Sequence, residues 1–569
     1  MSSAEMRDQS SHLVADHGSV YNALMSTLSS TLRQGLGSRV KAFAVLHPSS
    51  DVRPLSQALP ASSAVVFIGI ILDTEHAFRL VDQGPAAEDR EGERADKFRH
   101  LWGNKAELRR FKDGSITESV VWDVKNADER AYIPAMIVKH LLHNHFGIDA
   151  DAVKAWQPQF DGLLKAPESI RSMFEARDAM AGFKAALTAF DVLVKQMKAL
   201  DDKLPLAILN VSPVSSALRY TDVFVPIAMA PPSRAGLPTA ATYVPAMEII
   251  VEFEKSGRWP DDLRAIQKIK LAFYERLAAA LTEAVKGLHA TIVLGERAEP
   301  KEIQDEAALD IVTPEGWAFR ARIWHDREAT LLDRVINDQS HIPKAFRRHV
   351  SGDDAHEQQV ALMTRDAYNR RFIQAPRHHR VIAALSHKFA AFAGTARLTK
   401  RWFASHWLFC THVSEEAVEL LCAYIFLRTG ASAGGSETLA VVPGTKERGF
   451  AQVLGFLKDW DWTKDLVIPL GLEEQDIILA GGVKSTWGRA EAWSLITEFD
   501  PSGCMWTSTG PNAVVARRIT AIAKATWESL VGFDSQGFDI KVSALIQYAR
   551  HVLMIDFIAV LVPAPKRRL

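Results

Sequence analysis

The chain has 569 residues, of which 47% are hydrophobic and 24% are charged, and 67 lysines and arginines face 68 acidic residues. This length predicts roughly three or four domains, and the composition excludes wholesale disorder. A near-neutral charge is atypical of a protein that coats nucleic acid, so any RNA contact must come from a local basic surface. Three cysteines without a CxxC pair indicate a reducing compartment. No apolar run reaches the roughly 18–20 residues that a membrane span needs.

The first 165 residues alternate between helix and strand. Apolar residues at helical spacing predict a helix over 20–34, and continuous apolar runs predict strands over 40–46 and 64–72. An Asp-Gly pair supplies the positive φ of a tight turn, which predicts a hairpin over 107–122. An amphipathic helix follows over 133–146. These elements predict a mixed α/β unit.

Residues 166–338 have the same mixed character. Apolar residues at intervals of three and four positions predict one long helix over 172–200. Further along, the patterns predict two strands, a helix whose first turn is acidic, and a hairpin; these span 205–211, 247–253, 261–281 and 309–324. Strands and helices in this order indicate a second mixed α/β domain.

Residues 339–482 are predicted to be mostly helical. Helical patterns cover 381–392, 398–409, 415–427 and 450–460. A last unit, 483–569, begins with strand and loop and continues into a helix over 514–530. The predicted fold class is therefore α+β with several domains.

The predicted hairpin over 107–122 is the first candidate RNA-binding surface. It carries Arg109, Arg110 and Lys112, and Lys105 lies just before it. Four cations on one hairpin can bind phosphates. They can equally be the solvated outer face of the hairpin, and both readings stay open.

A second basic region covers residues 341–401, which hold twelve lysines and arginines against four acidic residues. Histidines and aromatic residues are interleaved with these cations, a mixture that can hold a phosphate backbone and stack a base. The alternative is a set of charges spread around several helices with no common face. The RNA-binding candidates here are Arg377, Arg380, Arg397, Lys400, Arg401 and Trp402.

Several long strings occur in an order typical of one family. They include FRHLWGNKAELRRFKDGSI at 98–116, VSPVSSALRYT at 211–221, TPEGWAFR at 313–320, RLTKRW at 397–402 and WTSTGP at 506–511. Over about residues 12–535 the chain resembles the Nrap family, nucleolar RNA-associated proteins of the small-subunit processome.

This resemblance implies two tandem copies of a class I CCA-adding enzyme, each with a nucleotidyltransferase head, a helical PAP/OAS1-like neck and an α/β body. It assigns 1–165 to a body-like domain that closes the first repeat, 166–338 to a nucleotidyltransferase-like head, 339–482 to the neck and 483–569 to a partial or divergent body. We therefore expect the chain to be a C-terminal portion that lacks the first head and neck.

Nucleotidyl transfer needs a Gly-Ser turn, two carboxylates at i and i+2 on a strand, and a third carboxylate nearby, so that two Mg²⁺ ions are bound. Here the turn position reads Ser212-Pro213, and Glu248 has no carboxylate two residues later. The strand expected to supply the third carboxylate carries Arg320 and Arg322 instead. Arginines would repel Mg²⁺, so the head is predicted to be catalytically degenerate, with no catalytic residue, metal or cofactor.

An alternative remains an active template-independent RNA nucleotidyltransferase. It would require Glu252, Glu254 and Asp310 to converge on metal. The favoured interpretation, by resemblance, is a non-catalytic RNA- and protein-binding scaffold for small-subunit rRNA maturation in the nucleus and nucleolus. The implied partners are pre-rRNA, small nucleolar RNA, an RRM-containing processome protein and casein kinase II, with no membrane.

Overall fold

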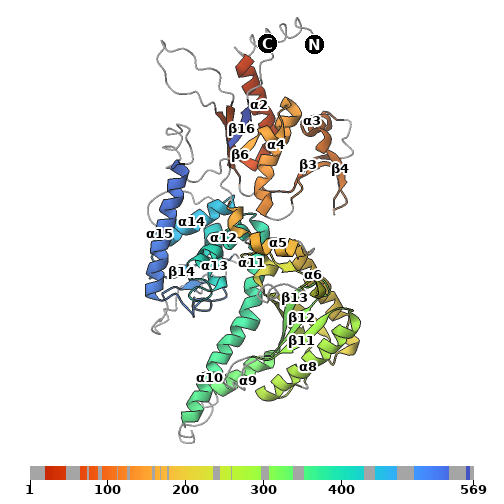
Figure 1. The fold of residues 1–569 in the computed structure, drawn as a ribbon, viewed down its shortest axis with the longest axis vertical. Helices are drawn as coiled ribbons and strands as arrows, with labels where there is room; N and C mark the ends of the chain where they lie inside the picture. The colour runs from red at the N-terminus through yellow and green to blue at the C-terminus, as the bar shows by residue number, and fades with distance from the viewer. Residues whose placement is uncertain are drawn as a thin grey trace.

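The computed structural model describes a mixed α and β molecule, as predicted (Figure 1). The described residues are 20–46, 65–73, 76–86, 92–111, 113–124, 128–156, 160–166, 168–175, 179–234, 244–257, 259–295, 307–337, 352–428, 442–470, 492–536 and 559–563. None of the helices within these ranges is long and apolar enough to cross a membrane.

The N-terminal unit packs two helices against a four-stranded sheet. Helices α2 (Val20–Leu36) and α4 (Ile133–Phe146) lie against this sheet, whose order is β1-β2-β16-β6. Its strands are β1 (Val40–Leu46), β2 (Val65–Leu72), β6 (Lys154–Trp156) and β16 (Ala559–Pro563). Strand β16 comes from the far end of the chain and pairs with β2 and β6 in antiparallel fashion, so both ends of the chain contribute to one sheet.

The predicted hairpin is confirmed in a second, three-stranded sheet of this unit. Strands β4 (Glu107–Arg110) and β5 (Ile116–Val121) pair in antiparallel fashion, and β3 (Val81–Ala86) pairs on the other side of β5. Helix α3 (Glu93–Trp102) precedes β4. The buried Arg39 donates to Asp82 at 2.8 Å, and the Trp122 indole N–H donates to the same carboxylate at 2.9 Å. This network joins the start of β1 to both β3 and β5.

The middle unit, called the sheet unit below, is built on a five-stranded sheet of order β11-β12-β13-β10-β8. The strands are β8 (Ile208–Pro213), β10 (Met247–Phe253), β11 (His289–Val293), β12 (Ala308–Val312) and β13 (Ala318–Trp324). Helices α6 (Phe183–Lys198) and α8 (Leu263–Ala284) cover one face, where Phe190 meets Phe319 and Phe273 meets Phe253. The alternate residues of β10 and β13 point to the opposite face, which holds the candidate site.

The long helix predicted over 172–200 is wrong. The chain instead forms α5 (Glu168–Glu175), the short strand β7 (Met180–Ala181) and then α6. Strand β7 pairs with β9 (Ile227–Ala228), and Gly182 adopts a φ of +147°, which side-chain-bearing residues avoid. The glycine turns the chain out of β7 into α6, an effect that apolar periodicity does not reveal.

The helical unit follows, and its predicted helices are present: the one over 415–427 has its predicted bounds, and the others have shifted ends. Its elements are α11 (Ala375–Lys388), α12 (Phe392–Ser405), α13 (Glu415–Leu427), α14 (Lys446–Asp459), α15 (Ala513–Gln536), β14 (Leu466–Val467) and β15 (Leu495–Ile496). Helices α9 (Asp326–Asn337) and α10 (Gly352–Tyr368) precede it and pack on the core of the sheet unit. Phe389 has an extended conformation that ends α11, so the predicted helix over 381–392 stops early. Tyr368 and Phe372 belong to the core of the sheet unit, whereas Val381 onward belongs to the helical core. The division of the chain at residues 165, 338 and 482 stays a prediction.

Candidate functional site

The face of the five-stranded sheet that α6 and α8 leave uncovered is where a nucleotidyltransferase would bind metal. The strand register places Glu248 of β10 beside Arg320 of β13, and Arg320 beside Asp310 of β12. Arg322 lies one step further along β13, beside Ile250. Acidic and basic side chains therefore alternate across this face.

The arginines on this face form ion pairs with the carboxylates that could have bound metal. Arg320 donates two parallel hydrogen bonds to Asp310, Nε to Oδ1 at 2.7 Å and Nη2 to Oδ2 at 2.8 Å. Arg322 Nε lies 3.6 Å from Glu248 Oε1. A two-pronged guanidinium–carboxylate pair fixes both oxygens and supplies the positive charge that a divalent ion would otherwise bring. Within the described ranges, no three acidic, histidine or cysteine side chains are grouped so that they could hold a metal ion.

The carboxylates required for the alternative enzymatic reading do not converge. Asp310 lies on β12, two strands from Glu252 on β10, which is a lateral separation of roughly 10 Å. On the intervening strand β13, Glu252 lies beside Trp324, whereas Asp310 lies beside Arg320, four residues earlier. This offset adds roughly 13 Å along the strands. The two carboxylates are thus roughly 16 Å apart, whereas a two-metal site needs ions about 4 Å apart. Glu254 follows the end of β10 and is exposed.

A second feature is a buried ionic cluster between the sheet unit and the helical unit. Its centre is Glu419 of α13, which accepts hydrogen bonds from Arg219 Nε at 3.0 Å, Lys400 Nζ at 2.7 Å and His378 Nε2 at 2.6 Å. The hydroxyl of Thr221 also donates to it. Arg219 ends the short helix η8 (Ser216–Arg219) of the sheet unit, while the other two partners lie on α12 and α11. The cluster therefore ties the two units together through buried charge.

The electrostatics of this cluster are set by opposed effects. Burial alone would raise the pKa of Glu419, but Arg219 and Lys400 hold that pKa well below its usual range. Burial alone would lower the pKa of Lys400, yet Glu415 and Glu419 raise it. Both partners therefore stay charged, and the two cations of the cluster are balanced by two carboxylates.

Three of the predicted RNA-binding residues are buried side chains of α12. Lys400 is fully buried in the cluster, and Trp402 is buried with its indole N–H donating to Thr526 at 3.2 Å. Arg397 is only 6% exposed and donates to the backbone oxygen of Asp222 at 3.0 Å. Side chains held this way are unavailable to an RNA backbone, because each already serves as an internal partner.

The remaining candidates are more accessible. Arg377 and Arg380 are exposed on α11, and Arg401 is half-buried with its guanidinium over the Phe224 ring at 5.4 Å. Arg109 and Arg110 are exposed on β4, where Arg109 pairs with a glutamate of the same strand at 2.9 Å. These groups lie on two separate parts of the molecule. The predicted candidate Lys112 lies outside the described residues.

The sequence contained a signal for the ionic cluster that the prediction did not use. Glu415 and Glu419 are spaced by four residues in α13, whose remaining inward positions are apolar. A glutamate on the apolar face of a helix requires a buried cation, and Lys400 was available on the preceding helix. Arg219 could not be matched to it, because the two residues are 200 positions apart in the chain.

The fold and the face described above define a nucleotidyltransferase-like protein with arginine–carboxylate pairs on the uncovered face of its sheet. Three family models match the chain: Nrap protein domain 3 at residues 1–147, Nrap protein nucleotidyltransferase domain 4 at 159–387, and Nrap protein PAP/OAS1-like domain 5 at 389–547. The chain belongs to the Nrap family. The predicted resemblance and fold class are confirmed.

Curated relatives match over most of the chain. It is 27% identical over 547 residues to U3 small nucleolar RNA-associated protein 22 of Schizosaccharomyces pombe, covering 93% of this chain and 45% of that protein. It is 28% identical over 529 residues to human Nucleolar protein 6, covering 89% and 42%. The Saccharomyces cerevisiae U3 small nucleolar RNA-associated protein 22 is 27% identical over 469 residues, covering 80% and 34%. The chain thus spans less than half the length of these relatives.

Proposed function

We propose that this chain is part of a non-catalytic RNA- and protein-binding scaffold of ribosome biogenesis. Its place is the nucleolus, and its process is pre-rRNA processing toward the small ribosomal subunit within the small-subunit processome. The names of the relatives, U3 small nucleolar RNA-associated protein 22 and Nucleolar protein 6, support this role. Pre-rRNA and small nucleolar RNA are the proposed RNA partners. An RRM-containing protein and casein kinase II are the protein partners that the family resemblance suggests.

The observation that carries the non-catalytic part of the proposal is the pair of Arg320 with Asp310. In a working enzyme, a carboxylate at this face would have to release its partner and bind Mg²⁺. Here both carboxylate oxygens are already engaged by one guanidinium. The sheet thus retains its fold but lacks the free carboxylates that nucleotidyl transfer with two metal ions needs.

Nucleotide incorporation tests this part directly. The purified chain is incubated with an RNA primer, Mg²⁺ and each labelled nucleoside triphosphate, and the expected result is no extension of the primer. Extension that depends on Mg²⁺ and disappears in Glu252→Gln would contradict the proposal, because it would require the carboxylates of this face to act on metal.

RNA binding is tested through the exposed cations of α11. Reversing both charges in Arg377→Glu/Arg380→Glu should weaken binding of a pre-rRNA fragment and reduce its salt dependence. The matched control is Lys268→Glu/Lys286→Glu, which reverses two exposed charges on the sheet unit. Equal binding by both double variants would show that α11 does not contact RNA.

A further inference from the structure

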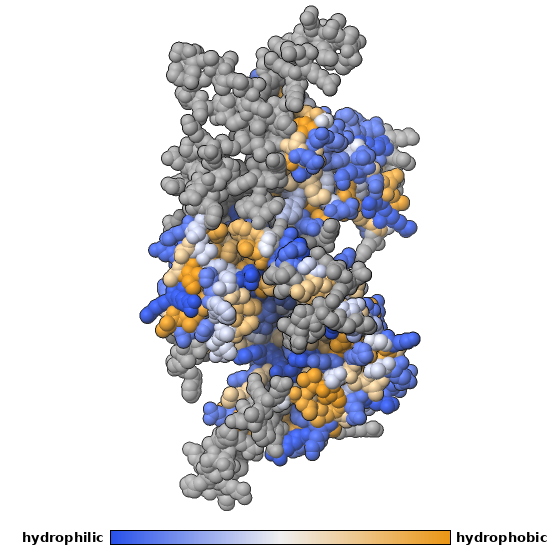
Figure 2. Space-filling view, viewed as in Figure 1, coloured by the Kyte–Doolittle hydropathy of each residue, from blue (hydrophilic) through white to orange (hydrophobic). Residues whose placement is uncertain are grey.

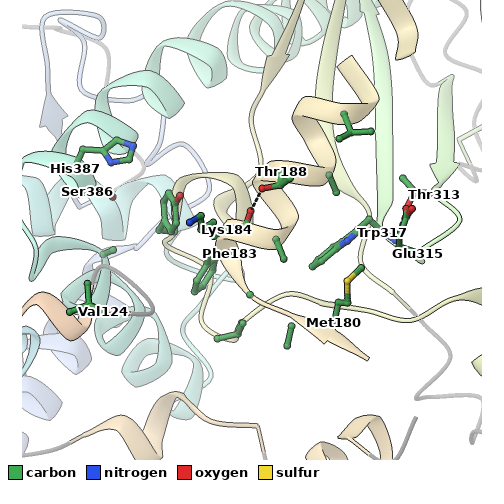
Figure 3. Close-up of a pocket in the computed structure, with 18 of the residues that line it drawn as sticks. Val124, Met180, Phe183, Lys184, Thr188, Thr313, Glu315, Trp317, Ser386 and His387 are labelled. Atoms are coloured by element: carbon green, nitrogen blue, oxygen red, sulfur yellow. Dashed lines mark hydrogen bonds between the residues drawn. The ribbon is translucent and has the colours of Figure 1, made fainter. Parts of the chain in front are cut away.

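A cavity of about 1070 Å³ lies where three parts of the chain meet (Figure 3). Its walls come from one side of α6 between Phe183 and Gln196, from the end of α11, and from a segment of the N-terminal unit that includes Val124 and Arg130. The loop between β12 and β13 closes another side with Glu315 and Trp317. None of the residues of the arginine-paired face lines this cavity. It is therefore a different place from the one where the fold family would bind metal.

The charge of the cavity wall is positive although the chain is neutral overall. Arg130, Lys184 and Arg397 line it, each from a different element, and Glu315 is the single carboxylate among the lining residues. Lys184 is exposed, and within the described residues no ion pair engages Lys184 or Arg130. A concave surface with an excess of one sign of charge concentrates the electric field and attracts an anionic ligand.

The N-terminus of α6 adds to this positive potential. Gly182 and the first residues of the helix line the cavity, and the first turn holds no acidic residue. The unpaired N–H groups at the beginning of a helix carry a partial positive charge, which favours phosphate oxygens. Lys184 lies within the same turn, so the helix end and the ammonium act on the same side of the cavity.

Aromatic rings form the other part of the wall. Tyr220 lies 5.8 Å from Phe183 and 6.0 Å from His387, measured between ring centroids. Tyr220 is held in a left-handed backbone conformation with a φ of +68°, which is unfavourable for a residue other than glycine. Its ring is only partly buried, so part of it is available for stacking. The ring faces of aromatic side chains stack on nucleic-acid bases without regard to sequence.

We infer that this junction cavity binds a segment of single-stranded RNA. The phosphates lie at Lys184, Arg130 and the start of α6, and a base stacks on Tyr220. A phosphorylated peptide fits less well, because such peptides are held by clusters of free arginines, and the Arg397 guanidinium is already engaged by the backbone oxygens of Asp222 and Val223. This inference rests on the proposed scaffold function and names where that scaffold holds RNA.

The test measures binding of fluorescein-labelled oligouridylate and oligoadenylate of eight nucleotides to the full chain. Lys184→Glu should weaken binding roughly tenfold. It should also reduce the steepness of the plot of log affinity against log salt concentration, the salt slope, by about one. Tyr220→Ala should weaken binding roughly five- to hundredfold with little change in salt slope, since stacking carries no charge. The matched control is Lys195→Glu, an exposed lysine of α6 that does not line the cavity, and it should bind like the unchanged chain.

The outcomes separate this inference from the scaffold proposal. Equal RNA affinity in Lys184→Glu and Lys195→Glu overturns the cavity but leaves the scaffold, because RNA is then held elsewhere. Binding of a phosphoserine peptide, but not of RNA, that depends on Lys184 makes the cavity a protein-docking site and overturns the inference. If Lys184→Glu fails to fold, photocrosslinking of a 4-thiouridine oligonucleotide to the unchanged chain replaces it. A crosslink on the peptide that contains Tyr220 supports the site, and crosslinks only to other peptides overturn it.

Discussion

Replacing Glu419 by glutamine should destabilise the docking of the helical unit on the sheet unit by about 3–5 kcal/mol, the usual cost of removing one partner from a buried ion pair. The carboxylate is fully buried and lies within 3.0 Å of two cations, Arg219 and Lys400. Each cation at such a distance contributes roughly 5–6 kcal/mol of attraction at an effective dielectric constant of 20. The cost of burying the carboxylate offsets part of this gain. After the change, Glu415 alone would balance both cations.

The measurement is urea unfolding followed by tryptophan fluorescence, because Trp506 packs beside His378 at the edge of the cluster. The neighbouring Glu416→Gln is the matched control. Burial raises the pKa of Glu416, so its charged form is already disfavoured and its neutralisation should cost less than about 1 kcal/mol. Equal midpoints for Glu419→Gln and the unchanged chain, or an equal loss in both variants, would refute the docking role of the cluster.

Three further predictions concern stability. Burial lowers the pKa of His379 to about 3, so below the unfolded pKa of about 6.5 the unfolded chain binds more protons. Stability should therefore fall as the pH drops from 6.5 to 5, with a slope that approaches about 1.4 kcal/mol per pH unit below pH 6, and urea midpoints of His379→Gln should show a flatter pH profile. Gly316→Ala should lower the melting temperature, because the added Cβ would lie 1.8 Å from a backbone oxygen and the residue has a φ of +98°. The control Gly257→Ala should leave the melting temperature unchanged, since no atom lies within 4 Å of its Cβ position. Lys270→Met should cost about 3–5 kcal/mol, because it removes the cation that balances the buried carboxylate of Glu328. Adding Glu328→Met should restore at least half of that loss in the same urea assay, and a double variant no better than the single one would contradict this.

Local patterns in the sequence predicted those elements whose signals are local. Strand β10 was predicted over its observed bounds because five of its seven residues are apolar and a proline-rich segment precedes it in the sequence. The β4–β5 hairpin followed from Asp113-Gly114, where the glycine has the positive φ that the turn requires. The break before α6 was missed, because a two-residue strand pairing with a distant segment leaves no periodic trace.

The sequence could predict the residue types of the candidate RNA surface but not their directions. The basic segment 341–401 divides in the structure: Arg377 and Arg380 point outward, whereas Arg397 and Lys400 point inward. Charge counting cannot separate these groups, because the acidic partner of Lys400 lies outside the counted segment, on α13. The charged pairs on the sheet were easier to anticipate, since alternation along β13 places its arginines on one face.

If this chain works as a scaffold with RNA of the small-subunit pathway, that RNA should be recovered with it from cells. The most direct test is affinity purification of the tagged full chain from nuclear extract, followed by sequencing of the RNA that is recovered with it. We expect enrichment of pre-rRNA and U3 small nucleolar RNA over a tagged control protein. Recovery of a folded, soluble chain with neither RNA would contradict it.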